Sequence, residues 1–284
     1  IHFYSVSQLS LVYPADGSVY LGDEIIDFTW NPCESCTAYT VQFSSDLNFE
    51  TFSEQQFLTT SVSIDTIAAK YFWRVTGLNS IGEIIATTAI RQIEFIDLEN
   101  MGNLQFWFDP NYGMTLGSSN EVLSWVSKSL NMYELTQSNI NQSPIKIPNQ
   151  IQEYSGIYFD GINNNTNGDY LSGGEVSLGS IFTVFRHHNN VASVHSGLPS
   201  PNANPRFAIS LGPPNGQYLH TYSSAFQNFK VNGMQTNQAP LNSWLLVSSV
   251  RNSSQNMSAY SISPMHSGYK RMTGCIMENI AFSN

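Results

Sequence analysis

The sequence predicts an all-β protein built from two successive β-sandwich domains. Short segments with strand-like alternation recur along the chain, separated by turn signals rich in Gly, Pro, Asn and Asp, and no segment has a convincing helical period. The length of 284 residues is ordinary for two domains. The charge balance also changes sharply about one third of the way along the chain, which indicates a domain boundary there.

The change in net charge along the chain locates this domain boundary near residue 100. Residues 1–99 hold three basic and thirteen acidic side chains, a balance of −10, whereas residues 100–284 hold eight of each. We therefore expect four parts: an N-terminal extension at residues 1–8, a first domain at 9–97, a linker at 98–103 and a second domain at 104–284.

Composition favours a secreted protein of the extracellular cell surface. Charged residues make up 11% of the chain, against about 25% in a typical soluble domain, so the polar surface must consist mainly of Ser, Thr, Asn and Gln. The chain begins on Ile1, which suggests removal of a leader or a fragment. No apolar run approaches the ~18 residues needed to span a bilayer, and no basic stripe can replace the counterions of nucleic acid. We therefore expect neither membrane insertion nor nucleic-acid binding.

Six segments of the first domain read as strands. Turn signals such as Pro14-Ala15-Asp16-Gly17 and Asn79-Ser80-Ile81-Gly82 separate them, a spacing typical of a sandwich. The expected strands are 9–12, 25–30, 39–44, 61–64, 71–76 and 88–95.

The second domain offers about ten strands, the size of a two-sheet jelly roll. The expected strands are 104–108, 121–126, 156–160, 181–187, 206–211, 218–222, 226–231, 243–251, 258–262 and 274–282.

Several motifs of the first domain resemble a fibronectin type III domain. An "L-x-x-P-x-D-G" pattern precedes a strand that ends in Phe28-Thr29-Trp30, and Tyr71-Phe72-Trp73-Arg74-Val75 follows later. The resemblance covers roughly residues 9–96. It implies that Trp30 is the core tryptophan and Tyr71 the tyrosine-corner residue. It also implies a spacer or adhesion module without chemistry of its own.

The second domain resembles the laminin-G-like, concanavalin A-like jelly rolls of bacterial surface proteins. The shared motifs are Trp107-x-Asp109, Val122-x-x-Trp125, the hairpin from Phe159 to Leu171, and the closing strand 274–282. The sequence departs from that pattern at 127–129, where an Asp often precedes the Ser. The pairing of two such domains is similar to secreted surface proteins of the Bacteroidetes. That fold mostly serves binding or construction.

The three cysteines suggest one disulfide and one buried thiol. Cys33 and Cys36 flank a turn, and the segment after them alternates as a strand rather than opening a helix. That context favours a local disulfide over a thioredoxin-like redox pair. A zinc site would need two further ligands, which the neighbourhood does not offer. Cys275 lies in the apolar closing strand and is expected to be buried and free.

A calcium ion is the one metal that the sequence suggests. Asp160, Asn163, Asn165 and Asp169 crowd one loop with the oxygen ligands that Ca²⁺ prefers. The alternative is an ordinary turn, since Asn and Gly tolerate left-handed backbone. Beyond this calcium we expect no cofactor. Zinc or another metal held by the histidines at 187, 188, 195 and 220 is less favoured, because adjacent residues at a strand end point to opposite faces.

One strand carries a candidate glycan-binding face. Tyr218, His220 and Tyr222 alternate, so their side chains share one face and can stack on a sugar ring. The alternative is the plain exterior of a strand in a tyrosine-rich protein.

We expect no catalysis. Glycosidases need a pair of carboxylates across the substrate, and no strand of the second domain carries an E-x-D, D-x-D or E-x-x-E set. A pair assembled from distant strands remains open at this point. No G-x-S-x-G elbow is present for serine chemistry.

Glycosylation signals are numerous but short. Sequons for N-glycosylation begin at Asn164, Asn252 and Asn256, and Asp65-Thr66-Ile67 resembles the O-glycosylation motif of Bacteroidetes secreted proteins, with Thr66 as acceptor.

Three functions follow as hypotheses. The favoured one is a non-catalytic adhesion or glycan-binding protein whose partners are extracellular glycans or other surface proteins. The second is a structural subunit of a filament or surface layer, a homopolymer in which the β-forming residues 1–7 add as a donor strand to a neighbouring sheet. The third is an accessory module of a polysaccharide-degrading enzyme.

Overall fold

A computed structural model of the chain describes residues 8–22, 24–65, 69–161, 168–188, 192–198, 207–212, 218–221, 228–257, 259–263 and 270–283. Within these residues the structure consists of strands, turns and a single 3-10 turn at Ile140–Gln142, with no α-helix. None of the described segments is a helix long and apolar enough to cross a bilayer. The chain divides into two compact units, Ile1–Leu98 and Glu99–Asn284. The predicted all-β class is confirmed.

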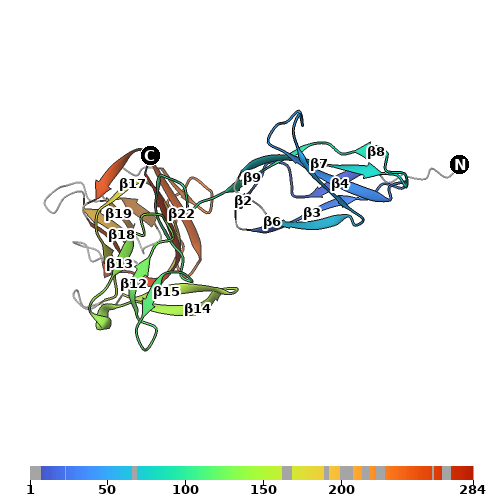
Figure 1. Cartoon of the computed structure of the whole chain (residues 1–284). Helices are drawn as coiled ribbons and strands as arrows, with labels where there is room; N and C mark the ends of the chain where they lie inside the picture. Colours follow the sequence, from blue (N-terminus) through green and yellow to red (C-terminus); the bar gives the residue numbers. More distant parts are fainter. Residues whose placement is uncertain are drawn as a thin grey trace. The chain divides into compact units, whose positions relative to one another are not determined.

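The first unit is a sandwich of two sheets (Figure 1). Neighbouring strands are antiparallel except for β2 and β9, which run parallel. The smaller sheet has the order β1 (Ser10–Tyr13), β3 (Ile25–Asn31), β6 (Ser61–Asp65). The larger sheet has the order β2 (Ser18–Leu21), β9 (Arg91–Ile96), β7 (Lys70–Leu78), β4 (Ala38–Ser44), β5 (Ser53–Phe57), with β8 (Ile84–Thr87) also on β7.

Aromatic rings fill the space between these two sheets. Phe28 on β3 meets Trp73 on β7 edge to face, with ring centroids 4.9 Å apart, and both side chains are fully buried. Trp30 also belongs to this core, where its ring packs against Tyr39. Buried aromatic side chains remove large apolar areas from water, so this cluster forms much of the core of the first unit.

Hydrogen bonds from Arg91 link the two sheets of the first unit. Its guanidinium, on β9, donates hydrogen bonds to the carbonyls of Leu11, Val12 and Pro14 at 2.7, 3.0 and 2.5 Å. Leu11 and Val12 belong to β1 in the opposite sheet. One guanidinium therefore donates to three backbone carbonyls in or next to β1.

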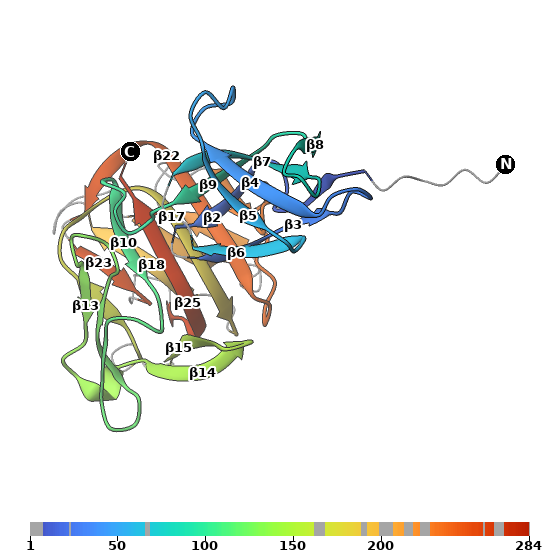
Figure 2. The same ribbon diagram turned by 45° about the vertical axis from the view of Figure 1, so that its right-hand side comes forward.

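The second unit is a larger sandwich. In Figure 2, β25 lies between β17 and β15. The first sheet has the order β14 (Ile145–Ile151), β15 (Tyr154–Asp160), β25 (Thr273–Phe282), β17 (Val176–His187), β22 (Leu245–Met257), β21 (Asn228–Val231), with β10 (Leu104–Phe108) also on β25. The second has the order β11 (Met114–Leu116), β12 (Val122–Val126), β13 (Glu134–Thr136), β16 (Leu171–Gly173), β23 (Ala259–Ile262), β18 (Ala192–Leu198), β19 (Phe207–Gly212), β20 (Tyr218–Thr221), with β24 (Lys270–Arg271) on β18.

Alternation along the strands decides which side chains enter the second core. On β10, Phe106 and Phe108 are fully buried among the core residues, and Phe106 packs on Tyr260 of the opposite sheet with centroids 4.9 Å apart. Trp107, between them, must therefore point away from the core, to the outer face of its sheet. The outer face of β10 and β25 is where the candidate site lies.

Candidate functional site

The site forms where β25 changes its neighbour. Along one edge β25 pairs first with β15, through Thr273 to Ile276, and then with β10, through Asn279 to Phe282. Met277 and Glu278 fall between these two ladders. On the opposite edge the register with β17 shifts at the same point, because Val184 pairs with Glu278 whereas Phe185 pairs with Ile276. Such β-bulges re-aim side chains and are common next to functional sites.

A pocket of about 180 Å³ lies at this junction. Two carboxylates line it: Asp109, directly after β10, and Glu278 on β25. Tyr154 and Ser155, at the start of β15, contribute a phenol ring and a hydroxyl, and Tyr154 is 60% exposed. The remaining wall is apolar, formed by Pro110, Ile151, Val184 and Met277. The pocket therefore combines an apolar wall with a few convergent polar groups, as small-molecule sites do.

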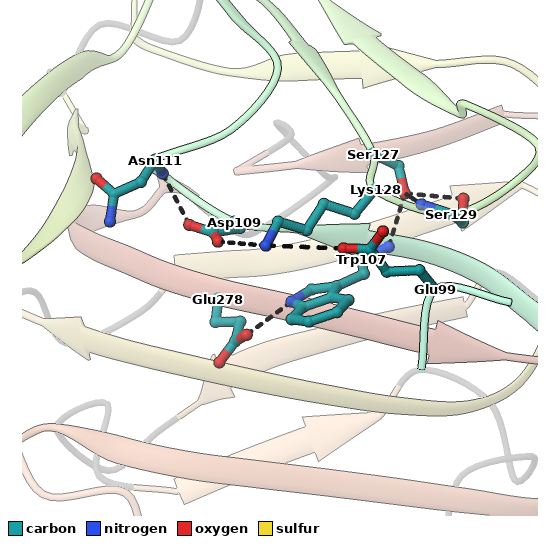
Figure 3. A network of polar contacts seen from close by, with 8 residues as sticks. All are labelled: Glu99, Trp107, Asp109, Asn111, Ser127, Lys128, Ser129 and Glu278. Atoms are coloured by element: carbon teal, nitrogen blue, oxygen red, sulfur yellow. Dashed lines mark hydrogen bonds and ion pairs between the residues drawn. The ribbon is translucent and has the colours of Figure 1, made fainter. Parts of the chain in front are cut away.

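Trp107 holds one of the two carboxylates. Its indole Nε1 donates a hydrogen bond of 2.7 Å to Glu278 Oε1 (Figure 3), and the Trp107 side chain is only 8% exposed. Because the Trp107 indole is packed in place, its hydrogen bond restricts the rotation of the Glu278 carboxylate. The orientation of the Glu278 carboxylate is therefore set before any ligand arrives.

Lys128 holds the other carboxylate. Its ammonium lies 3.0 Å from Asp109 Oδ2 and 4.0 Å from Glu99 Oε1. The same nitrogen stands over the Trp107 ring, 4.5 Å from its centroid, and 5.6 Å from the centroid of Tyr112. The second carboxylate oxygen of Asp109 accepts from the backbone N–H of Asn111 at 2.8 Å (Figure 3). Both oxygens of Asp109 are thus engaged within the protein.

The loop at 127–129 fixes Lys128 in this position. Ser127 Oγ accepts a hydrogen bond from the backbone N–H of Trp107 at 2.7 Å and another from the N–H of Ser129 at 3.0 Å. The backbone N–H of Lys128 donates to the Trp107 carbonyl at 2.9 Å. The segment that departs from the lectin-like pattern therefore supplies the cation of the site.

Electrostatics distinguish the two acids. Burial raises the pKa of Glu278, and the nearby charge of Asp109 raises it further, while the Trp107 hydrogen bond and Lys128 act in the opposite direction without cancelling the rise. The Glu278 carboxylate has no hydrogen-bond donor other than Trp107 among the residues that the structure describes. It is the group left to interact with a ligand.

The predicted calcium loop is described only at its two ends. Asp160 and Asp169 are linked reciprocally, because the N–H of Asp160 donates to Asp169 Oδ2 at 2.9 Å and the N–H of Asp169 donates to Asp160 Oδ1 at 3.3 Å. Asn163 and Asn165 lie outside the described residues. The described parts of the chain contain no group of three or more His, Cys, Asp or Glu side chains placed to hold a metal. Calcium at this loop stays a prediction.

The predicted glycan-binding face lies in β20. Tyr218 and His220 belong to that strand, whose side chains are not described, and Tyr222 lies outside the described residues. Sugar binding by this face stays a prediction.

Two of the histidines have structural partners. His187 is fully buried and its Nε2 lies 3.0 Å from the Ala239 carbonyl, while the Nδ1 of His188 contacts Asn242 Oδ1. His187 is thus a hydrogen-bonded core residue.

The cysteines behave as expected from the sequence. Cys33 and Cys36 are joined in a disulfide. Cys275 is free and 1% exposed, and burial raises the pKa of its thiol. The disulfide packs over Gly77 of β7, where a Cβ would collide with both sulfur atoms. Only glycine fits there, so the turn and the neighbouring strand depend on each other.

The glycosylation acceptors are placed only in part. Asn252 and Asn256 lie on β22, and Asn256 is exposed. Asn164 and Thr66 are outside the described residues. Their modification stays a prediction.

The residues of the junction pocket escaped the search for catalytic or binding motifs. Asp109 and Glu278 belong to two family-like strand patterns and to the carboxylates of the second domain, but they are 169 positions apart, and no motif spacing pairs them. One local signal does distinguish Glu278, since it is the only charged residue in the closing strand Gly274–Phe282. A charge in the middle of an otherwise apolar strand is uncommon and points to a function.

Comparison with known proteins finds no matching family model and no matching curated protein. Solved structures that align include carbohydrate-binding modules from the beta-sandwich super family, at 10% identity and a TM-score of 0.34 over 98% of this chain and 97% of theirs. The fibronectin(III)-like modules of Clostridium thermocellum CbhA align at 9% identity and a TM-score of 0.25, over 31% of this chain and 95% of theirs. An alpha-L-rhamnosidase from Dictyoglumus thermophilum aligns at 10% identity and a TM-score of 0.31, over 98% of this chain and 28% of the enzyme.

Proposed function

We propose that this chain is a non-catalytic glycan-binding protein of the extracellular cell surface, in which a fibronectin type III-like spacer carries a laminin-G-like lectin domain. The junction pocket between β10, β15 and β25 is its sugar-binding site. The observation that carries the proposal is the pocket itself, with its two carboxylates, its exposed tyrosine and its apolar wall.

The size and lining of the pocket suit one sugar ring. Its volume of about 180 Å³ is many times what a single water molecule needs. Sugar hydroxyls are hydrogen-bond donors, and a carboxylate such as Glu278 is a strong acceptor for them. The C–H face of a pyranose is apolar and fits against Val184, Met277 and the ring of Tyr154. Both requirements of a sugar ring are therefore met within one pocket.

The pairing of Asp109 supports binding without hydrolysis. A glycosidase needs two carboxyl groups free to act on the substrate, one as acid and one as base or nucleophile. Asp109 is engaged by the Lys128 ammonium and by the Asn111 N–H, so that Glu278 is left without a second active carboxylate in the pocket. We expect no release of reducing sugar from a panel of polysaccharides. Release that disappears in a Glu278→Gln variant would contradict this part of the proposal.

A glycan array followed by calorimetry tests the binding function. The variant Tyr154→Ala removes an exposed ring from the pocket without touching the core, and we expect at least a tenfold loss of affinity for the best glycan. Tyr13→Ala is the matched control, because Tyr13 is a comparably exposed tyrosine, at 42%, in the first unit. Equal affinities for wild type and Tyr154→Ala would place sugar binding elsewhere.

One observation favours assembly into a filament as a second function. Among the strands of the described residues, β5 pairs with β4 alone and lies at an edge of its sheet, and Ser53, Glu54, Gln55 and Gln56 are all exposed. An open edge of this kind can accept a strand from a neighbouring molecule, although the charge of Glu54 weakens such pairing. Electron microscopy of concentrated full-length chain tests this function, and a monodisperse monomer would exclude it.

A further inference from the structure

We propose that the junction pocket selects a sugar that carries a free amino group, a 2-amino-2-deoxyhexose unit bound as its ammonium form. This inference rests on the proposed glycan-binding function and names the substrate class of the same pocket. It follows from the charge balance at the pocket, the surroundings of Glu278 and the shape of the wall.

The negative charge of Asp109 is already balanced. One of its oxygens faces the Lys128 ammonium at 3.0 Å, and the other accepts the Asn111 N–H at 2.8 Å. The charge of Glu278 is not balanced in this way. Its single donor among the described residues is the neutral indole of Trp107, and no described cation forms an ion pair with it. Of the two carboxylates that line the pocket, Glu278 is therefore the one without an ion-pair partner among the described residues.

The surroundings of Glu278 make a cation a better partner than a hydroxyl. The carboxylate is partly removed from water by the apolar residues around it, and burial accordingly raises its pKa. Removing a charge from water is costly unless an opposite charge accompanies it. A hydrogen bond between two charged groups is roughly twice as strong as a neutral one. A ligand ammonium thus gains more at Glu278 than a sugar hydroxyl in the same place.

The wall of the pocket requires more than an inorganic ion. Metal ions with hard oxygen preferences need several carboxylate or carbonyl ligands, whereas only Glu278 is left to coordinate here. Ile151, Val184 and Met277 present carbon atoms to the space, and Tyr154 adds a ring at its edge. These groups suit the apolar face of a pyranose. An amino sugar combines the cation and the ring in one ligand.

Lys128 shows next to the pocket how an ammonium is held by this part of the fold. Its nitrogen forms an ion pair with the Asp109 carboxylate and cation–π contacts with the rings of Trp107 and Tyr112. The lining of the pocket likewise includes one such carboxylate, that of Glu278, and one aromatic residue, Tyr154. Carboxylate and aromatic face together favour cations over neutral groups.

Three trisaccharides with the same β-1,4 linkage test the inference on the full chain by isothermal titration calorimetry at pH 6.5 and low salt. They differ only at carbon 2, which bears an amine in the glucosamine trimer, an acetamide in chitotriose and a hydroxyl in cellotriose. We expect the glucosamine trimer to bind at least tenfold more tightly than cellotriose. Glu278→Gln should abolish that preference, because glutamine keeps the shape of the side chain and its acceptor for Trp107 but loses the charge. Glu134→Gln, an exposed acid on β13, should leave it unchanged.

The outcomes separate the inference from the proposed function. Equal binding of the three trisaccharides, or a preference for the amine that persists in Glu278→Gln, overturns the inference and leaves glycan binding standing. If the wild-type chain binds none of the three, and Tyr154→Ala leaves every glycan affinity unchanged, both the inference and the pocket as a sugar site are refuted. Circular dichroism of each variant shows that a loss of binding does not come from unfolding.

Discussion

The hydrogen bond between Trp107 and Glu278 can be measured by a double-mutant cycle. Trp107→Phe removes the indole N–H and keeps an aromatic ring, whereas Glu278→Ala removes the acceptor of this hydrogen bond. The double variant completes the cycle. Losses that Trp107→Phe causes elsewhere, such as the contact of its ring with Lys128, occur in both backgrounds and cancel in the coupling free energy.

The expected size of the coupling follows from the geometry. The bond is short at 2.7 Å, and its donor side chain is nearly buried. Hydrogen bonds to charged groups contribute ~1.5–3 kcal/mol to stability, and Glu278 keeps some contact with solvent, so we expect a coupling of ~1.5 kcal/mol at pH 8. Each kcal/mol corresponds to roughly 2–4 °C in the melting temperature of a domain of this size.

The pH dependence has a defined sign. Because burial raises the pKa of Glu278 above that of the unfolded chain, the native state binds the additional proton. The stability from the protonated acid is fully present below the ordinary carboxyl pKa and is lost as the pH rises through the raised pKa. Glu278→Gln avoids this loss, so the variant should gain stability relative to wild type as the pH rises from 4 to 8. Asp109 and Lys128 face the same carboxylate and remain in both proteins.

Differential scanning calorimetry of the full chain between pH 4 and pH 8 measures both quantities on the transition of the second unit. The coupling should also be larger at pH 8, where Glu278 accepts as a carboxylate, than at pH 4. A coupling below 0.5 kcal/mol at pH 8, or a Glu278→Gln variant that loses stability relative to wild type as the pH rises, would refute this account of the site.

Three further predictions concern other parts of the chain. Gly77→Ala should destabilise the first unit in thermal unfolding by ~2 kcal/mol or more, as overpacking does. Replacing Cys33 and Cys36 by serine in that background should restore part of the lost stability. If no stability returns, the proposed contact between residue 77 and the disulfide is wrong. Cys275 should resist a thiol reagent in the native chain and react fully in guanidinium; rapid native labelling would show that it is accessible. Deleting residues 1–7 should leave both units folded and abolish any polymer that electron microscopy detects; unchanged polymers would exclude a donor strand.

The longer strands were predictable because their burial alternates. β3 and β17 place buried and more exposed side chains in turn, and this pattern is visible in the sequence as a period of two. Residues 104–108 were predicted as a strand with the bounds that β10 has in the structure. Hydrophobic patterning sufficed wherever a strand has one face in a core.

The strands that the sequence did not reveal lack that pattern. β5 reads Ser-Glu-Gln-Gln-Phe and lies at an edge, where only Phe57 is even partly buried, so no apolar alternation marks it. β14 contains Pro148, which normally argues against a strand and is tolerated here because β14 is also an edge. β11, β13 and β16 have three residues each, too few for a period to register. Their pairing depends on tertiary partners that are distant along the chain.

The candidate site could not be predicted from the sequence, because its residues are also far apart along the chain. The sequence carries no carboxylate pair on one strand face and leaves a pair from distant strands open; Asp109 and Glu278 are such a pair, brought together because β10 pairs with β25, with Phe108 opposite Asn279. That arrangement depends on register between segments at opposite ends of the domain. Motif spacing carries no information about it, and the Lys128 contact to Asp109 adds a third distant segment.

Glu278 nevertheless shows why a charge in an apolar strand is informative. Its carboxylate is desolvated and has an indole as its only described donor, so glutamine at the same place would keep the hydrogen bond and avoid the desolvation of a charge. For folding alone, the neutral side chain is therefore the better choice at this position. Folding does not account for the carboxylate, whereas a cationic ligand group in the pocket does, because it would supply the missing opposite charge. The stability that Glu278→Gln gains at neutral pH and the ligand preference that it loses should accordingly come from the same unbalanced charge.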